Sequence, residues 1–93
     1  MAKALRPRRL VRDSKGRQAI TLELQRGAGS PFTTRRWKVM RLAGGTDIES
    51  EESLTELGTV TQENFLEAID SNRQGRRELA ALFPEHVKTV LGG

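Results

Sequence analysis

The stretch "RRLVRDSKGRQAITLELQ", residues 8–25, contains the clearest structural signal in the chain. In its second half Ile20, Leu22 and Leu24 alternate with polar residues, which is the period of a strand with one buried face. The intervening "SKGR" contains Gly16, which readily adopts the positive φ that a tight turn requires. Residues 8–25 are therefore predicted to form an antiparallel β-hairpin.

A third strand is predicted over "TTRRWKVMRL", residues 33–42, after the Gly/Ser/Pro connection at 26–32. Alternation divides its side chains between two faces, Arg35, Trp37, Val39 and Arg41 on one and Arg36, Lys38, Met40 and Leu42 on the other. Neither face is cleanly apolar, whereas a core strand should separate the two classes better. Two interpretations of Trp37 therefore stay open: a ring buried in the core, or a ring exposed on a basic surface.

The segment "AGGTDIESEESLTE", residues 43–56, is polar and acidic and contains two glycines. This composition is typical of a surface loop, and a loop is predicted here. A short fourth strand is predicted directly after it, from Leu57 to Val60.

The last third of the chain has helical spacing. Thr61 is a suitable N-cap, and Glu63 lies in the first turn, where the helix dipole favours negative charge. The apolar positions that follow are Phe65, Leu66 and Ile69, and then Leu79, Leu82 and Phe83. Residues 71–75 interrupt the pattern, Pro84 suits the first position of a further helical turn, and Gly92–Gly93 is expected to stop the last helix.

These elements predict an α+β fold, with an N-terminal antiparallel β-meander of three to four strands followed by two or more short helices packed on one face. The other face of the sheet is expected to stay open. The predicted organisation is a basic flexible arm at 1–7, one small domain at 8–91 and a tail at 92–93. Within the domain we expect a basic sheet at 8–42, an acidic loop at 43–56 and a helical half at 57–91.

Composition limits the class of protein. The chain has 93 residues, a hydrophobic fraction of 35% and no cysteine, so neither a disulfide framework nor a thiolate metal site is available. It contains no apolar run long enough to cross a membrane and none after its basic N-terminus, so a cytoplasmic protein is expected. Because only four residues are aromatic, the core is lean, and a homodimer through the helical half is expected to complete its burial.

Charge is distributed unevenly along the chain, although the net charge is only +4. Residues 1–42 contain twelve Lys/Arg and two Asp/Glu, whereas residues 43–93 contain four Lys/Arg and ten Asp/Glu. The basic half should attract polyanions and the acidic half should repel them. In the alternative interpretation the two halves neutralise each other, within one fold or across a dimer.

The basic strands predict a nucleic-acid-binding surface that works mainly through phosphate contacts, with the N-terminal arm as a second contact. Lys and Arg release counterions from the phosphate backbone, and an exposed Trp37 would stack on an unpaired base. The predicted binding residues are Arg8, Arg9, Arg12, Lys15, Arg17, Arg35, Arg36, Trp37, Lys38 and Arg41. DNA and RNA, single-stranded or double-stranded, stay open as the ligand, and a regulatory role would follow.

Catalysis is not expected. His86 is the only histidine, and no nucleophile–base set can be built around it. The acidic run "DIESEE" does not have the spacing of a calcium loop, so no metal and no cofactor are predicted. The alternative function is that of a small adaptor or inhibitor, of the kind that phages and plasmids encode, which binds a partner protein through its acidic or basic half.

The basic meander followed by "LGTVTQENFLEAI", residues 57–69, resembles the whirly and transcriptional-coactivator single-strand binders in architecture. The resemblance covers about residues 8–70 and implies strands first, a helix last and dimerisation through helices. The chain departs from that pattern in the long spacing between Leu42 and Leu57 and in its additional helical segment.

Overall fold

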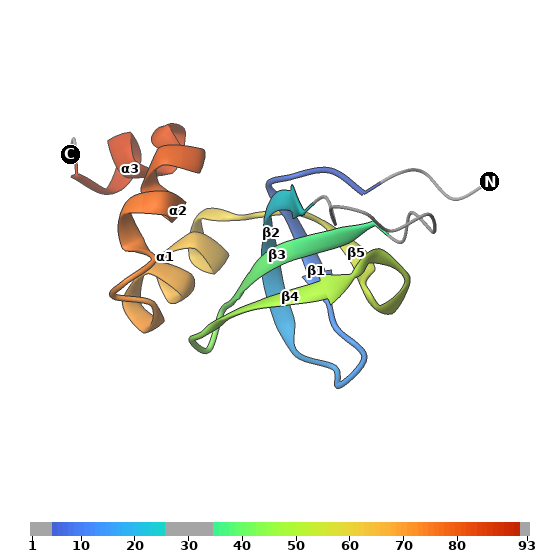
Figure 1. Ribbon diagram of the computed structural model, residues 1–93. Helices are drawn as coiled ribbons and strands as arrows, with labels where there is room; N and C mark the ends of the chain where they lie inside the picture. The colour runs from blue at the N-terminus through green and yellow to red at the C-terminus, as the bar shows by residue number, and fades with distance from the viewer. Residues whose placement is uncertain (1–4, 26–34, 92–93) are drawn as a thin grey trace.

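The computed structural model describes residues 5–25 and 35–91, which form a sheet followed by helices (Figure 1). The strands are β1 (Arg9–Arg12), β2 (Gln18–Gln25), β3 (Arg36–Arg41), β4 (Thr46–Ser50) and β5 (Thr55–Thr59), and the helices are α1 (Gln62–Ser71), α2 (Arg76–Leu82) and α3 (Pro84–Leu91). The predicted α+β class is confirmed, with five strands in the described residues instead of three to four. The first four residues of the predicted arm, the connection at 26–32 and the tail at 92–93 lie outside the described residues.

All strand pairs in the sheet are antiparallel, and the strand order is β4-β3-β2-β1-β5. The predicted hairpin is confirmed, since β1 pairs with β2 and Leu10 lies opposite Ile20. Gly16 adopts a φ of +83° in the turn. One buried carboxylate fixes this turn, because Asp13 Oδ1 accepts hydrogen bonds from the backbone N–H groups of Lys15 and Arg17, both at 2.9 Å.

The predicted acidic loop at 43–56 is wrong for most of its length, because β4 and a 3-10 turn (Glu51–Ser53) lie within it. β4 pairs with β3 through the glycine turn that follows Leu42, with Ile48 opposite Lys38. None of its five residues is buried. An edge strand with polar side chains on both faces has no hydrophobic alternation, so its composition is that of a loop.

The fourth predicted strand exists as β5, which begins two residues before the predicted Leu57. β5 does not continue the meander next to β4. Only residues 51–54 separate it from β4, yet it pairs with β1 at the other end of the strand order. The sheet is therefore curled, so that its two edge strands come close enough for the short 3-10 segment to join them (Figure 1).

The helices begin where the sequence predicts. Thr61 caps α1 in a reciprocal capping box, since Asn64 N–H donates to Thr61 Oγ1 and Thr61 N–H donates to Asn64 Oδ1, each at 3.1 Å. Pro84 opens α3. At the C-cap of α1 the buried Asn72 side chain donates to the carbonyl of Arg41 and accepts from the N–H of Gly45, so it fastens the helices to the β3–β4 turn.

One hydrophobic core lies between the sheet and the helices. Its buried residues are Leu10, Ile20, Leu22, Met40, Leu42, Val60, Phe65, Ala68, Leu79 and Phe83. The rings of Phe65 and Phe83 meet edge to face, with centroids 5.8 Å apart. This core confirms that the helices pack on one face of the sheet.

A second core covers the opposite face, so the prediction of an open face is wrong. Its buried residues are Leu5, Val11, Ala19, Trp37 and Val39, with Leu24 and Leu54 packed against them. Leu5 comes from the predicted arm and Leu54 from the 3-10 turn region, and the bend of the sheet brings both over this face. Each face of β3 is buried only in part. Apolar residues therefore occur on both faces beside Arg and Lys, and neither face is cleanly apolar in sequence. None of the helices that the structure describes is long and apolar enough to cross a membrane.

Candidate nucleic-acid interface

Trp37 is a core residue. Only 1% of its surface is exposed, and its indole N–H donates to Glu51 Oε1 at 2.9 Å. The ring packs within the second core, beside Val39 and Leu5. Trp37 is therefore not available to stack on a base, which corrects its inclusion among the predicted binding residues.

The Glu51 carboxylate joins three parts of the chain. Its Oε1 accepts hydrogen bonds from Trp37 Nε1 at 2.9 Å, from Arg35 Nε at 3.0 Å and from the Leu5 N–H at 3.2 Å. Burial alone would raise the pKa of Glu51, but the hydrogen bonds from Trp37 and Arg35 and the Arg35 charge lower the pKa below its ordinary value. Arg35 also donates to the Leu5 carbonyl at 3.1 Å, so the segment that leads into β1 is anchored at both backbone groups of Leu5.

Six of the predicted binding residues form ion pairs within the chain. The pairs are Arg8–Glu85, Arg9–Glu56, Arg17–Asp13, Arg35–Glu51, Lys38–Glu78 and Arg41–Asp47. Five of them join the basic first half of the sequence to its acidic second half. Antiparallel pairing of β4 with β3 and of β5 with β1 brings the acids of 43–56 next to the bases.

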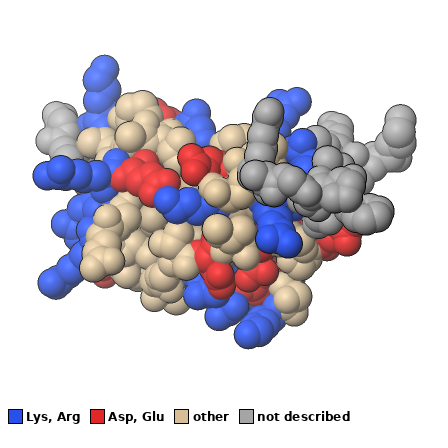
Figure 2. Space-filling view, viewed as in Figure 1, with Lys and Arg blue, Asp and Glu red and all other residues tan. Residues whose placement is uncertain are grey.

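The surface reflects this neutralisation. Basic and acidic side chains are interspersed on the face that Figure 2 shows, without one continuous basic area. The five ion pairs between the halves support the alternative interpretation of the charge pattern, in which the halves complement each other within one fold or across a dimer. Surface ion pairs of this kind contribute little stability, about 0–1 kcal/mol each, but they neutralise the field that a polyanion would meet.

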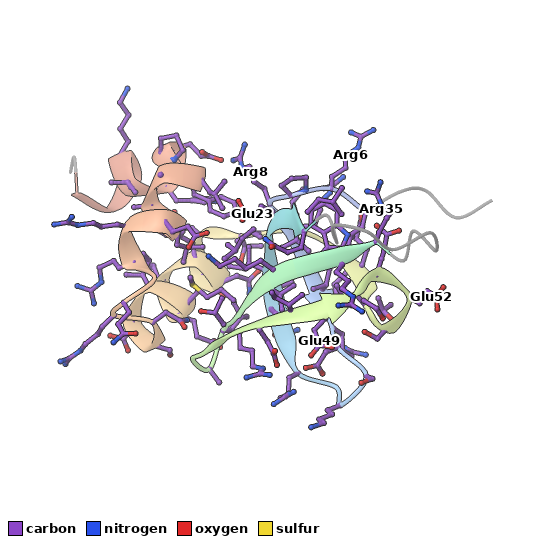
Figure 3. The ribbon with its side chains drawn as sticks, in the orientation of Figure 1. Arg6, Arg8, Glu23, Arg35, Glu49 and Glu52 are labelled. Atoms are coloured by element: carbon purple, nitrogen blue, oxygen red, sulfur yellow. The ribbon has the colours of Figure 1, made fainter. Side chains whose placement is uncertain are left out.

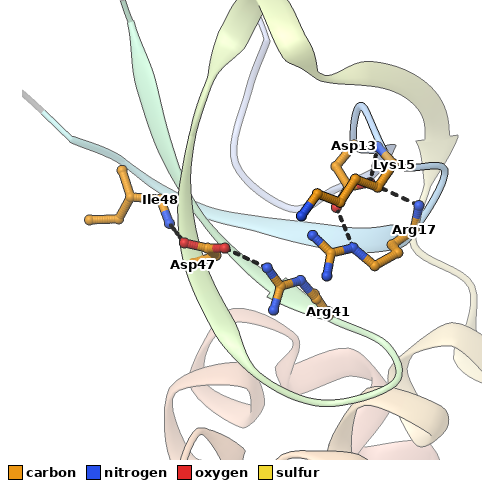
Figure 4. Close-up of polar contacts among 6 residues, drawn as sticks. All are labelled: Asp13, Lys15, Arg17, Arg41, Asp47 and Ile48. Carbon is orange, nitrogen blue, oxygen red and sulfur yellow. Dashed lines mark hydrogen bonds and ion pairs between the residues drawn. The ribbon is translucent and has the colours of Figure 1, made fainter.

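Two of these pairs hold turns in place (Figure 4). Arg41 pairs with Asp47 across the β3–β4 turn, and Arg17 Nε donates to Asp13 Oδ2 at 2.9 Å. Burial alone would raise the pKa of Asp13, but its hydrogen bonds from Arg17 and Lys15 lower the pKa overall. Arg17 and Arg41 therefore have a structural role that the strand pattern did not predict.

Three of the predicted residues are exposed or partly exposed cations without an ion pair among the described residues: Arg12, Lys15 and Arg36. The same is true of Arg6, which the prediction assigned only to the arm. At the helical end Arg73, Arg76, Arg77 and Lys88 are also exposed and form no ion pair in the described part of the chain.

A hollow of about 330 Å³ lies where the segment before β1 passes the helices. It is lined by Arg6, Pro7, Arg8, Arg9, Thr59, Val60, Phe83 and Glu85. Figure 3 shows Arg6 and Arg8 on the same side of the molecule, where Arg6 projects into solvent and Arg8 lies next to the helices. The run "RPRR" is the sequence signal for this cluster, but the lining residues Val60 and Phe83 lie more than fifty positions further along the chain.

Arg8 has an unusual backbone conformation at this hollow. Its φ is +66°, in the left-handed region that non-glycine residues seldom adopt, and its N–H donates to the Thr21 carbonyl at 2.9 Å. Its guanidinium lies 4.8 Å from the centroid of the Phe83 ring and pairs with Glu85. The left-handed turn thus directs Arg8 toward the helices and forms one wall of the hollow.

The described residues offer no group of three or more His, Cys, Asp or Glu that would hold a metal ion. His86 stacks against Phe65 and Phe83 with ring centroids 5.4 and 5.6 Å away, and its Nε2 lies 3.3 Å from the Val60 carbonyl oxygen. These contacts place His86 in the packing between α3 and the end of β5.

No family model, no curated protein and no solved structure matches this chain. The architectural resemblance to single-strand binders therefore carries no further argument, and the function has to be inferred from the site itself.

Proposed function

We propose that the protein binds nucleic acid, mainly through phosphate contacts, and that the centre of the interface is the hollow lined by Arg6, Arg8 and Arg9. The observation that carries this proposal is that three arginines, Arg6, Arg8 and Arg9, line one concave site, whose acidic lining residue, Glu85, is paired with Arg8. Arginine offers a planar fork of N–H donors that matches phosphate oxygens, and a concave site brings several donors to one anion.

Exposed cations outside the hollow extend the proposed interface. Arg12 ends β1 and Lys15 lies in the turn that follows, while Arg36 begins β3. None of the three side chains forms an ion pair among the described residues, so each can bind phosphate without breaking one. The other predicted residues, which stabilise the fold, are left out of the interface.

A salt titration tests the proposal. Anisotropy measures the binding of a fluorescently labelled oligonucleotide. The logarithm of the association constant should fall linearly with the logarithm of the salt concentration. Each phosphate contact should contribute about 0.7 to the slope on a single strand and about 0.9 on a duplex. The double substitution Arg6→Ala/Arg9→Ala should lower the slope by about 1.4 on single strands if both residues contact phosphate.

The matched control is Arg73→Ala/Arg77→Ala, which removes the same charge from two exposed residues at the helical end. If both double variants weaken binding equally, net charge alone determines affinity and the hollow is not the interface. If the wild-type protein binds neither single-stranded nor double-stranded oligonucleotides at low salt, the proposed function is wrong.

A protein partner is the second candidate function, and one observation favours it. Ile48 is 54% exposed in the edge strand β4, between Asp47 and Glu49. An edge strand has backbone groups that a partner strand can pair with, and the flanking carboxylates would favour a basic partner. Such binding should depend on salt much less than phosphate binding does, and Ile48→Lys should abolish it.

We also propose a homodimer through the helical half, as the lean core led us to expect. The supporting feature is Leu66 of α1, which is 40% exposed. Sedimentation equilibrium measures the association, and Leu66→Glu should shift a dimer toward monomer.

A further inference from the structure

We infer that the hollow beside Arg6 holds one unpaired nucleotide, so that the nucleic acid recognised by this protein is single-stranded. This inference rests on the proposed function and adds the strand type, which the sequence left open. Two features of the hollow carry it: its wall, which combines Arg6 and Arg9 with apolar residues and with a Glu85 carboxylate already paired with Arg8, and its size.

The cationic part of the wall has two guanidinium groups that an incoming phosphate can reach. Arg6 forms no ion pair among the described residues, and the Nε of Arg9 is 3.7 Å from the nearest Glu56 oxygen, longer than a hydrogen bond. Arg8, in contrast, is committed to Phe83 and Glu85. A phosphate is therefore expected between Arg6 and Arg9, with Arg8 as the fixed side of the hollow.

The apolar part of the wall includes Pro7 and Val60, and the exposed Thr59 ends β5 at its rim. A bare phosphate would gain nothing from apolar contacts, whereas a nucleotide has a flat base whose faces are apolar. The planar guanidinium of Arg8, held against the Phe83 ring, adds a surface on which a base can stack. The hollow thus offers partners for both the phosphate and the base of one nucleotide.

The size of the hollow distinguishes single strands from duplexes. At about 330 Å³ it lies at the lower end of the range of small-molecule sites and is far too small for a base pair with its two backbones. A base in a duplex would have to be unstacked and unpaired before it could enter, which costs a few kcal/mol. A single strand presents its bases without that cost.

The test compares three ligands of equal length: a single-stranded oligonucleotide, its duplex, and an abasic single strand that keeps the phosphates. We expect the wild-type protein to bind the single strand at least about fivefold more tightly than the abasic strand, since base stacking of ordinary strength gives at least that gain. The duplex should bind more weakly than the single strand at the same salt concentration.

One pair of variants locates the effect. Thr59→Glu places a carboxylate at the rim of the hollow, where Arg9 lies opposite Thr59 in the β1–β5 pair. Thr46→Glu makes the same change at an exposed threonine of β4, on the other edge of the sheet. Thr59→Glu should lower the affinity for the single strand about tenfold, whereas Thr46→Glu should have an effect of less than about twofold. Circular dichroism confirms that both variants fold.

The outcomes separate this inference from the proposed function. If the wild-type protein binds single strand, abasic strand and duplex equally, or if the two glutamate variants behave alike, the nucleotide site is wrong while phosphate binding stands. If a nucleoside monophosphate binds the hollow but the single strand is not preferred over the duplex, the occupant is a free nucleotide and the inference is overturned. If no oligonucleotide binds, both proposals fail together.

Discussion

Glu51 is the residue whose replacement tests the structural account most directly. Its Oε1 atom accepts hydrogen bonds from Trp37, Arg35 and Leu5, at 2.9, 3.0 and 3.2 Å. In Glu51→Ala the buried indole N–H of Trp37 loses its partner, which costs about 1–3 kcal/mol. Arg35 is partly exposed and regains water, so its loss adds less. We expect a total loss of about 2–3 kcal/mol in the free energy of unfolding.

Thermal unfolding followed by circular dichroism measures this loss. For a domain of this size each kcal/mol corresponds to a change of about 4–8 °C in Tm, so Glu51→Ala should melt at least about 8 °C below wild type. The control is Glu52→Ala in the same 3-10 turn, because Glu52 is exposed and projects away from the ribbon (Figure 3). It should change stability by no more than about 0.5 kcal/mol. Equal melting temperatures for the two variants would refute the role of Glu51.

The same carboxylate predicts how stability depends on pH. The folded state lowers the pKa of Glu51, so its contribution is fully present above the ordinary glutamate pKa and is lost as the pH falls through the lower folded value. Glu51→Gln keeps one acceptor oxygen but cannot titrate. The stability of this variant should therefore fall less than that of wild type between pH 7 and pH 3, as urea unfolding at each pH would measure. A loss as large as that of wild type would contradict the assignment.

Three further substitutions test separate parts of the fold. Asp13→Asn should lower stability at neutral pH, because the folded state lowers the pKa of Asp13. The variant should also lose less stability than wild type as the pH falls. Urea unfolding at several pH values measures both effects, and a pH profile equal to that of wild type would contradict this. Thr61→Ala removes the N-cap of α1 and should cost about 1 kcal/mol by urea unfolding, whereas no loss would mean that the capping box is dispensable. Gly75→Ala places a Cβ atom 2.2 Å from the Cε atom of the buried Met40, and this overpacking should cost about 1–3 kcal/mol by thermal unfolding; a variant as stable as wild type would show that Met40 moves aside freely.

The parts of the fold that the sequence predicts well are those that local interactions determine. The hairpin at 8–25 follows from a glycine turn and from apolar alternation through Ile20 and Leu22. The predicted alternation fails at Leu24, which lies beyond a register shift in the β2–β3 pair and packs against the second core. Helix α1 begins where predicted because the cap residue and the apolar spacing agree. β4 was not predictable in this way. It is held by backbone pairing with β3 and has no buried side chain, so nothing in its composition distinguishes it from a loop.

The candidate site was less predictable than the fold, because it depends on contacts between distant parts of the chain. Trp37 lies on a strand with mixed faces, and its burial follows only from the bend of the sheet and the arrival of Leu5 and Leu54. The ion pairs of Arg9 and Lys38 require the positions of β5 and α2, which no local pattern provides. Conversely, Arg6 becomes a candidate only because its neighbour Leu5 is anchored in the core.

The hydrogen bond from Leu5 to Glu51 also bears on the proposed function, and it reverses the change in affinity that charge alone predicts. Glu51→Ala removes a negative charge together with the acceptor oxygen that holds Leu5, and simple electrostatics predicts tighter binding of a polyanion. The structure predicts the opposite, because Glu51 holds the backbone of Leu5 and thereby positions Arg6 at the hollow. We therefore expect Glu51→Ala to bind a single-stranded oligonucleotide more weakly than wild type at equal salt, whereas Glu52→Ala, with the same change in charge at an exposed position, should bind slightly more tightly. If both variants bind more tightly, charge alone governs the interaction, and the placement of the segment before β1 has no role in it.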